Sequence, residues 1–147
     1  MKKRILFVCT GNTCRSPLAA AFLQKLSDAY EVQSAGVFAQ DGSPMSDGSQ
    51  HVLQKRGITC DHEAQLVTTA LVDWADLILT MSHNHKVYLQ SQYVDVNDIF
   101  TLKEFIGADQ LDIADPFGQA ASVYEETALE IEEALKQFIE KDNGKNT

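Results

Sequence analysis

The feature that most constrains this chain is the alternation of short apolar runs with segments of helical periodicity. An apolar run that starts at Ile5 predicts a buried strand, and Leu18, Phe22 and Leu26 recur at helical spacing soon after it. Strands that alternate with helices favour an α/β fold around a parallel sheet. We predict strands over residues 4–8, 31–34, 76–80 and 98–101, helices over residues 17–28, 50–56 and 83–92, and a loop over residues 37–49.

The last predicted helix is the most regular segment. Its apolar positions recur at intervals of three and four with glutamates between them, as expected for a helix with one face packed on a sheet. The polar segment after it, residues 143–147, is expected to fray. A chain of 147 residues can bury one substantial core, and we expect residues 1–147 to form one domain. The apolar positions of this helix are Tyr124, Ala128, Ile131, Leu135 and Phe138.

Charge and hydropathy argue against several classes of function. The net charge of −9 argues against a protein that binds nucleic acid by neutralising phosphates. No apolar run approaches the roughly 18 residues of a membrane span, so we expect no membrane association. The odd number of cysteines and the lack of an export signal favour a reducing cytoplasm. Basic side chains gather in residues 1–30, which could suit an anionic group presented by a larger partner. On charge alone, a solvated surface tuned for solubility is the alternative.

The residues that carry chemistry stand between the first predicted strand and the first predicted helix. Ligands of an open parallel sheet bind outside the carboxyl ends of its strands, and a short Gly-containing loop before a helix can wrap its amides around an anion. Cys9 opens this loop and Arg15 closes it six residues later. This spacing favours covalent phosphoryl transfer by a thiolate, with a guanidinium on the phosphoryl oxygens. A buried cysteine and a salt-bridged arginine in an ordinary turn are the alternative. The candidate phosphate-binding residues are Thr10, Gly11, Asn12, Thr13, Cys14, Arg15 and Ser16, of which Ser16 could donate a hydrogen bond to the thiolate.

The loop and its surroundings resemble the low-molecular-weight protein-tyrosine phosphatase family. The matching motifs lie at residues 8–17, 34–36, 42–44, 75–81 and 115–116, so they span nearly the whole chain. The resemblance implies a flavodoxin-like three-layer fold, with a four-stranded parallel sheet and helices on both faces. It also implies that Cys9 is the nucleophile, that Arg15 holds the phosphate and that Asp115 is the general acid. No metal and no cofactor is implied.

Asp115 is also a candidate on chemical grounds. A leaving oxygen or nitrogen departs badly as an anion, so an acid must protonate it, and the resulting carboxylate can then activate water against a phosphocysteine. Asp115-Pro116 is equally compatible with a simple helix start, and Asp109 and Asp112 lie nearby, so the residues alone leave the choice open. The resemblance favours Asp115. The aromatic Phe117 that follows is a candidate for substrate specificity.

Thr13 bears on which phosphorylated residue is bound. Many family members carry a larger aliphatic residue at this position, and threonine resembles the bacterial protein-arginine phosphatase branch, as do residues 34–39, 81–86, 100–104 and 115–118. Phosphoarginine offers N–H donors beside the phosphorus, and a buried N–H without a partner costs roughly 1–3 kcal/mol. Loss of one methylene contact with a phosphotyrosine ring costs only about 0.8 kcal/mol. A threonine without a role in specificity is the alternative, and phosphotyrosine is the second candidate substrate.

The same branch implies phosphorylated proteins as substrates, a protein-arginine kinase as the functional counterpart and a role in the stress response. The family resemblance also implies a reversible disulfide between Cys9 and Cys14, for which a small loop residue at position 14 is the alternative. Cys60 has no evident partner and is expected to be structural. His83 and His85 could bind a metal, but no third ligand is near in the sequence, so we expect helix-start and surface roles.

Three other classes share parts of this pattern. A thiol-dependent arsenate reductase would need a relay pair of cysteines, and only Cys60 remains for it. A phosphocysteine carrier domain of a sugar transport system would need neither Arg15 nor Asp115. A non-catalytic phosphopeptide-binding or redox-sensor module would tolerate loss of the acid. Turnover of an aryl phosphate separates an enzyme from the last two classes.

Overall fold

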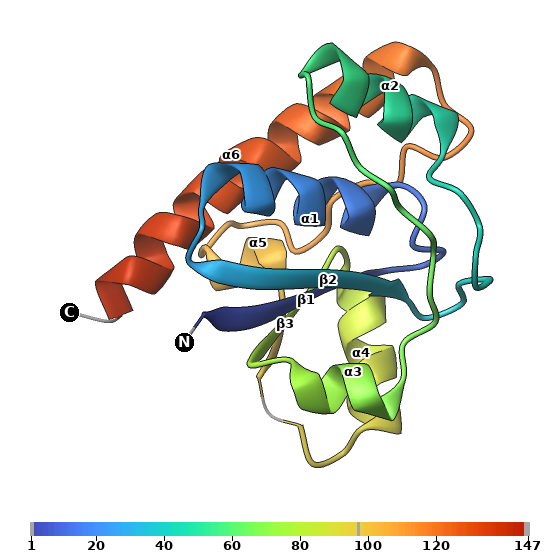
Figure 1. Cartoon of the computed structure of the whole chain (residues 1–147). Helices are drawn as coiled ribbons and strands as arrows, with labels where there is room; N and C mark the ends of the chain where they lie inside the picture. The colour runs from blue at the N-terminus through green and yellow to red at the C-terminus, as the bar shows by residue number, and fades with distance from the viewer. Residues whose placement is uncertain (1, 97, 146–147) are drawn as a thin grey trace.

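The computed structural model describes residues 2–96 and 98–145, which form a sheet between two layers of helices (Figure 1). All strand pairs are parallel, and the strand order is β2-β1-β3-β4. The predicted four-stranded parallel sheet with helices on both faces is confirmed. The strands are β1 (Lys3–Cys9), β2 (Tyr30–Gly36), β3 (Leu77–Thr80) and β4 (Ile99–Thr101). The helices are α1 (Arg15–Leu26), α2 (Asp47–Lys55), α3 (Thr69–Trp74), α4 (His83–Gln92), α5 (Leu102–Phe105) and α6 (Ala121–Lys145).

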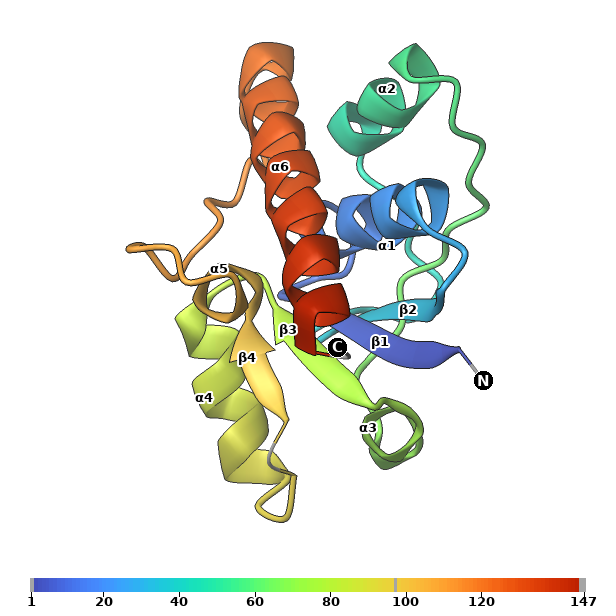
Figure 2. The same ribbon diagram turned by 90° about the vertical axis from the view of Figure 1, so that its left-hand side faces the viewer.

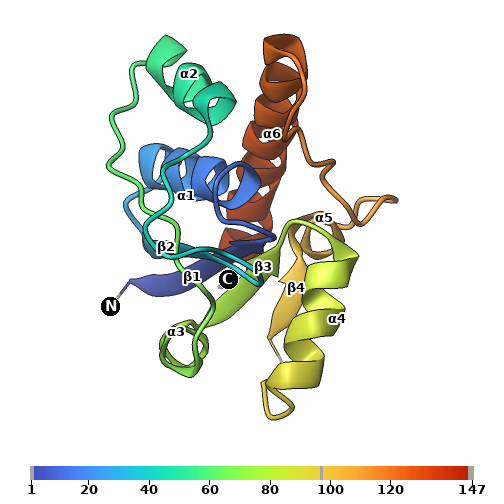
Figure 3. The same cartoon turned by 90° about the vertical axis from the view of Figure 1, so that its right-hand side faces the viewer.

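The two faces of the sheet carry separate cores because successive strand side chains point to opposite sides. In β1, Ile5 and Phe7 belong to the core under α1, α2, α5 and α6, whereas Leu6 and Val8 belong to the core against α3 and α4. Figure 3 shows α1, α2 and α6 on one side of the sheet and α3 and α4 on the other. Strands buried on both faces explain why the first apolar run is continuous rather than alternating.

Two short helices, α3 and α5, were not predicted from the sequence. They have six and four residues, too few to display a 3.6-residue apolar period. Both are defined by their caps. Thr68 accepts a hydrogen bond from the Leu71 amide at 3.2 Å, and Thr101 and Glu104 form a reciprocal capping box. The second pattern, threonine followed three residues later by glutamate, is a signal that the sequence does contain.

Helix α2 starts at Asp47, three residues before the predicted start, and includes part of the expected loop. Gly48 explains the misreading, because glycine usually marks a loop. Here a Cβ atom at position 48 would lie 2.5 Å from the ring of Tyr124 on α6, so glycine is the residue that lets the two helices approach closely.

The prediction that residues 143–147 fray is wrong for residues 143–145, which continue α6, while residues 146–147 lie outside the described residues. The last turns of α6 are held by a buried carboxylate. Asp142 contacts the Lys3 ammonium at 2.6 Å and accepts a hydrogen bond from the Tyr30 hydroxyl at 2.7 Å. Figure 2 shows α6 running along α1 toward the sheet, so this end of the helix is joined to the starts of β1 and β2.

The sheet order also locates the binding crevice. β1 connects through α1 to β2 on one side, and its neighbour β3 connects through α4 to β4 on the other. The connections from the carboxyl ends of β1 and β3 therefore run in opposite directions, and such a switch point is where ligands of open α/β sheets bind. The loop between β1 and α1 occupies this point (Figure 1). None of the helices in the described part of the chain is long and apolar enough to cross a membrane.

Candidate active site

The loop between β1 and α1 turns its carbonyl groups toward the surrounding protein. The Cys9 and Thr10 carbonyls accept hydrogen bonds from the amides of Val37 and Phe38 at 3.0 and 2.9 Å. The Asn12 carbonyl accepts from His62 at 2.6 Å. Within the described chain, the amides of residues 11–14 donate to no other group. The loop therefore offers several free N–H donors at the start of a helix, which is the arrangement that binds an anion.

The side chain of Asn12 fixes the shape of this loop. Asn12 is fully buried and has a φ of 58°, a left-handed conformation that asparagine tolerates better than most residues. Its amide nitrogen donates to the hydroxyls of Ser16 and Ser34 at 2.8 and 2.9 Å, and its oxygen accepts from the Gln65 amide at 3.0 Å. Four segments of the chain thus meet at one side chain.

Ser16 connects this network to the candidate nucleophile. The Ser16 hydroxyl lies 2.8 Å from the Cys9 sulfur and already accepts a hydrogen bond from Asn12. When Cys9 is a thiolate it carries no hydrogen, so the hydroxyl must be the donor between them. This geometry suits the role expected for Ser16, which is to stabilise the thiolate both as nucleophile and as leaving group.

Arg15 is held rigidly below the loop. Its side chain is 6% exposed, and one guanidinium nitrogen donates to the Ile113 carbonyl at 2.8 Å. The other terminal nitrogen lies 3.7 Å from a carboxylate oxygen of Asp115. Ile113 is itself tied to the end of β3, because its amide donates to the Met81 carbonyl at 2.8 Å. The segment that carries Asp115 is therefore anchored beside the loop.

These groups line a cavity of about 260 Å³. The buried residues Cys9 and Arg15 line its inner part. Asp115 and Phe117 lie at its rim, where the Asp115 side chain is half exposed and Phe117 is exposed. The structure thus brings together the predicted nucleophile, cation and acid. The loop residues in the lining are Cys9, Thr10, Gly11, Thr13, Cys14 and Arg15, whereas the predicted phosphate-binding residues Asn12 and Ser16 lie buried behind it.

The surroundings of the three candidate acids distinguish Asp115 from the other two. Asp112 accepts a hydrogen bond from the His83 amide at 2.7 Å and so caps α4. Asp109 and Asp112 are not part of the cavity lining, whereas Asp115 is. The Asp115 carboxylate also accepts from the Phe117 amide at 3.0 Å, which leaves its second oxygen directed toward Arg15.

Cys14 lies under the loop with its thiol surrounded by hydroxyls. The sulfur is 3.2 Å from the Ser46 hydroxyl and 3.6 Å from the Tyr124 hydroxyl. Burial and this thiol contact raise the pKa of Tyr124. Cys9 and Cys14 are both buried free thiols in this structure, and both line the cavity. The predicted disulfide between them stays a prediction.

His85 is a site residue that sequence reasoning missed. The expected helix-start role is confirmed for His85 by its place in the first turn of α4, but the expected surface role is wrong, because His85 is 5% exposed. His83 is exposed as predicted. The His85 ring contacts the Thr10 hydroxyl at 2.9 Å and completes a capping box with Ser82 at the start of α4. Burial, followed by the charge of Arg15, lowers the pKa of His85 to about 4. A serine followed three residues later by a histidine was the available signal for the cap.

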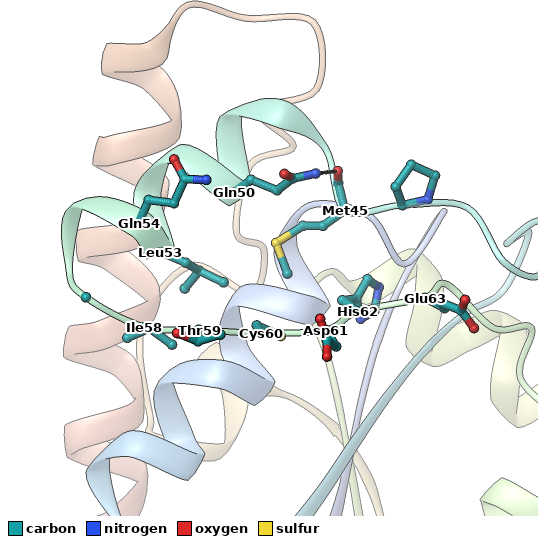
Figure 4. Close-up of a pocket in the computed structure, with 12 residues that line it drawn as sticks. Met45, Gln50, Leu53, Gln54, Ile58, Thr59, Cys60, Asp61, His62 and Glu63 are labelled. Carbon is teal, nitrogen blue, oxygen red and sulfur yellow. Dashed lines mark hydrogen bonds between the residues drawn. The ribbon is translucent and has the colours of Figure 1, made fainter.

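A larger cavity of about 950 Å³ lies between α2 and residues 57–63 (Figure 4). Its described lining includes Cys60, Asp61 and Glu63 but no arginine or lysine, so it offers no guanidinium or ammonium group for a phosphate. Cys60 is exposed and lies outside both cores, which corrects the expected structural role. Partial desolvation of its thiol, followed by the charge of the neighbouring Asp61, raises the pKa of that thiol. Of these described lining residues, His62 forms a hydrogen bond to the β1–α1 loop, at the Asn12 carbonyl. Across the described residues, no cluster of three or more His, Cys, Asp or Glu is arranged to hold a metal.

Comparison with known proteins places this fold and site in a family. A family model described as low molecular weight phosphotyrosine protein phosphatase matches residues 4–146, and the chain belongs to this family. It is 43% identical to a protein-arginine-phosphatase of Geobacillus stearothermophilus, with 96% of this chain and 97% of that protein covered. It is 40% identical to the low molecular weight protein-tyrosine-phosphatase PtpB of Staphylococcus epidermidis, over 87% of this chain and 91% of that protein.

A solved structure carries the comparison to the site. It is described as YwlE arginine phosphatase in a cysteine-to-serine mutant with a phosphorylated active site serine. Its TM-score with this chain is 0.91 at 36% identity, and the match covers 94% of each chain. The expected fold is therefore confirmed by a structure of the same family as well as by the strand order.

Proposed function

We propose that this chain is a protein phosphatase that transfers phosphate to Cys9 and then to water, and that its substrates are proteins phosphorylated on arginine. The single observation that carries the proposal is the shared cavity of about 260 Å³, lined by a thiol, a guanidinium and a carboxyl group. The family match over residues 4–146 supports the extension of this domain over nearly all of the chain.

In the first step, the Cys9 thiolate attacks phosphorus and forms the S–P bond while the P–N bond to the arginine side chain breaks. Arg15 and the free loop amides bind the three equatorial oxygens, whose charge must be stabilised during the transfer. Asp115 gives its proton to the departing nitrogen, so the arginine side chain leaves as a guanidinium, its ordinary protonated form.

In the second step, the Asp115 carboxylate takes a proton from water as the water oxygen attacks the phosphorus of phosphocysteine. The P–O bond forms, the S–P bond breaks, and inorganic phosphate leaves. The Ser16 hydroxyl, 2.8 Å from the sulfur, donates to the thiolate that is released. Cys9 is then again a thiolate and Asp115 is again protonated, as before the first step. The phosphorylated serine of the YwlE mutant supports a covalent intermediate at the corresponding side chain.

Thr13 and Asp115 favour phosphoarginine over phosphotyrosine. Both line the cavity, so a guanidinium held there would find a hydroxyl and a carboxylate for its N–H groups. The 43% identity to a protein-arginine-phosphatase supports this choice. The similar identity of 40% to a protein-tyrosine-phosphatase makes phosphotyrosine the second candidate.

The test is release of phosphate from phosphoarginine protein and phosphotyrosine protein, measured side by side at equal concentrations with Cys9→Ser as the blank. We expect the ratio of kcat/KM to favour phosphoarginine, and Thr13→Ile to move the ratio toward phosphotyrosine by roughly 3- to 30-fold. A wild-type preference for phosphotyrosine would overturn the substrate and leave the phosphocysteine mechanism standing. Binding of both substrates without turnover would favour the non-catalytic module.

We also propose a redox response and a cellular setting for this activity. The nearby thiols of Cys9 and Cys14 support a protective disulfide, which peptide mass spectrometry after mild peroxide would detect; a Cys9 sulfinic acid without that bond would contradict it. A protein-arginine kinase is the proposed counterpart, because an arginine phosphatase needs its product. The odd number of cysteines supports a reducing cytoplasm, and the net charge of −9 supports protein rather than nucleic-acid partners.

A further inference from the structure

His85 and Thr10 form a contact that the phosphoryl-transfer scheme does not use. They come from different sides of the crevice: Thr10 follows β1 in the loop, and His85 lies in the first turn of α4, which follows β3. The His85 Nε2 atom lies 2.9 Å from the Thr10 hydroxyl oxygen. His85 is 5% exposed, whereas Thr10 is exposed and lines the cavity. The buried ring thus stands directly behind a hydroxyl at the anion site.

The partners of the ring determine where its proton lies. The backbone amide of Ser82 donates to His85 Nδ1 at 3.2 Å, and a backbone amide can only donate. Nδ1 therefore carries no hydrogen. The Ser82 hydroxyl lies 2.9 Å from the same nitrogen and supplies a second donor. In the neutral ring the hydrogen must then be on Nε2, the atom that faces Thr10.

This tautomer also orients the Thr10 hydroxyl. Because Nε2–H donates, the Thr10 oxygen is the acceptor, and its own hydrogen is left for another group. Within the described chain, the Thr10 hydroxyl has no other hydrogen-bond partner. The remaining direction is the cavity, where the loop amides of residues 11–14 are also free.

We propose that His85 is a positioning residue that holds the Thr10 hydroxyl as a hydrogen-bond donor to the phosphoryl oxygens bound in the loop. The relay runs from the Ser82 amide through the imidazole to the hydroxyl, so the cap of α4 and the anion site are joined by one ring. Charged groups near the ring are Arg15, Asp112 and Asp115. The inference rests on the proposed function only in that the cavity binds a phosphate group.

The test separates the two nitrogens of the ring. The amide of asparagine reaches only as far as Nδ1, so His85→Asn keeps a polar atom for the Ser82 amide and loses the donor to Thr10. The amide of glutamine reaches as far as Nε2, so His85→Gln keeps that donor. Thr10→Val removes the hydroxyl and Thr10→Ser retains it. His83→Asn is the matched control, since His83 lies exposed on the same turn.

The probe is inorganic phosphate, and its Kd is taken from amide chemical shifts of residues 11–14, which report only folded molecules. We expect His85→Asn and Thr10→Val each to raise Kd roughly ten-fold or more, as for the loss of a hydrogen bond to a charged group. The Kd of the double variant should stay within about two-fold of the Kd of whichever single variant binds phosphate less tightly. Glutamine at position 85 and serine at position 10 should remain within about three-fold of the wild-type Kd.

A purely structural role for His85 would make the two effects on phosphate affinity multiply, and that result would overturn the proposal. Nitrogen-15 spectra of the wild-type imidazole give an independent measurement should His85→Asn fail to fold: we expect a proton on Nε2, and a proton on Nδ1 alone would contradict the relay. A wild-type protein that binds no phosphate would contradict the proposed function itself. Phosphate binding that is unaffected by the variants would contradict only the relay.

Discussion

Two cavities of the described chain, the smaller one at the β1–α1 loop and the larger one between α2 and residues 57–63, differ in size and in chemistry. The described lining of the larger one, about 950 Å³, has a thiol and two carboxylates but no arginine or lysine, whereas the smaller one, about 260 Å³, combines a thiol, a guanidinium and a carboxyl group. A phosphate needs positive charge and free N–H donors more than it needs space. Volume alone would therefore favour the larger cavity for a phosphate, whereas the convergence of complementary groups favours the smaller one.

The most severe test of this comparison replaces one cysteine in each cavity. We expect Cys9→Ser to lower kcat for an aryl phosphate by roughly 10⁴-fold or more, because the alkoxide that would replace the thiolate is not available near neutral pH. Cys60→Ser in the larger cavity should leave kcat and KM unchanged. Steady-state hydrolysis by the purified proteins gives both values. Loss of activity on replacing Cys60 would reverse the assignment of the two cavities.

The carboxylates provide a second matched pair. Asp115→Asn should lower kcat by roughly 10²- to 10⁴-fold, because the leaving group then departs without a proton. Asp61→Asn, in the larger cavity, should have no effect on turnover. Asp112→Asn should reduce stability through the α4 cap rather than turnover, since Asp112 contacts the His83 amide and lies outside the smaller cavity. If Asp112→Asn had the larger effect on kcat, Asp115 would not be the acid.

The buried histidine beside the smaller cavity predicts a response to acid. The pKa of His85 is about 4 in the folded protein, below its ordinary value of 6.5, chiefly because the ring is buried. The unfolded chain therefore binds the proton more tightly, and this contribution to stability is complete above pH 6.5 and is lost as pH falls toward 4. Its full size is roughly 3 kcal/mol.

Urea unfolding at pH 7 and pH 4.5 measures this contribution against a background of titrating carboxylates. The free energy of unfolding should fall more for the wild type than for His85→Gln, which has no titrating group at this position. Equal losses in the two proteins would mean that the ring does not resist protonation in the folded state.

The fold could be predicted because its signals are local. The apolar run at Ile5, the glycine-containing loop and the period of α6 each lie within one segment, and strands and helices follow from such segments. The role of His85 could not be predicted, because its contact with Thr10 joins residues 75 positions apart and depends on β1 and β3 being neighbours. The same applies to Asn12, whose partners Ser34 and Gln65 come from β2 and from a later loop.

The smallest expected effect concerns the hydrogen bond between His62, in the lining of the larger cavity, and the β1–α1 loop. The His62 ring donates to the Asn12 carbonyl at 2.6 Å, and Asn12 in turn holds Ser16 beside the Cys9 sulfur. Loss of one neutral hydrogen bond corresponds to about 0.5–1.5 kcal/mol, so His62→Leu should lower kcat/KM by roughly 2- to 12-fold. His62→Gln, which keeps a donor at a similar reach, should recover most of this loss. An effect as large as that of Asp115→Asn would mean that the larger cavity takes part in catalysis directly, and the distinction between the two cavities would then fail.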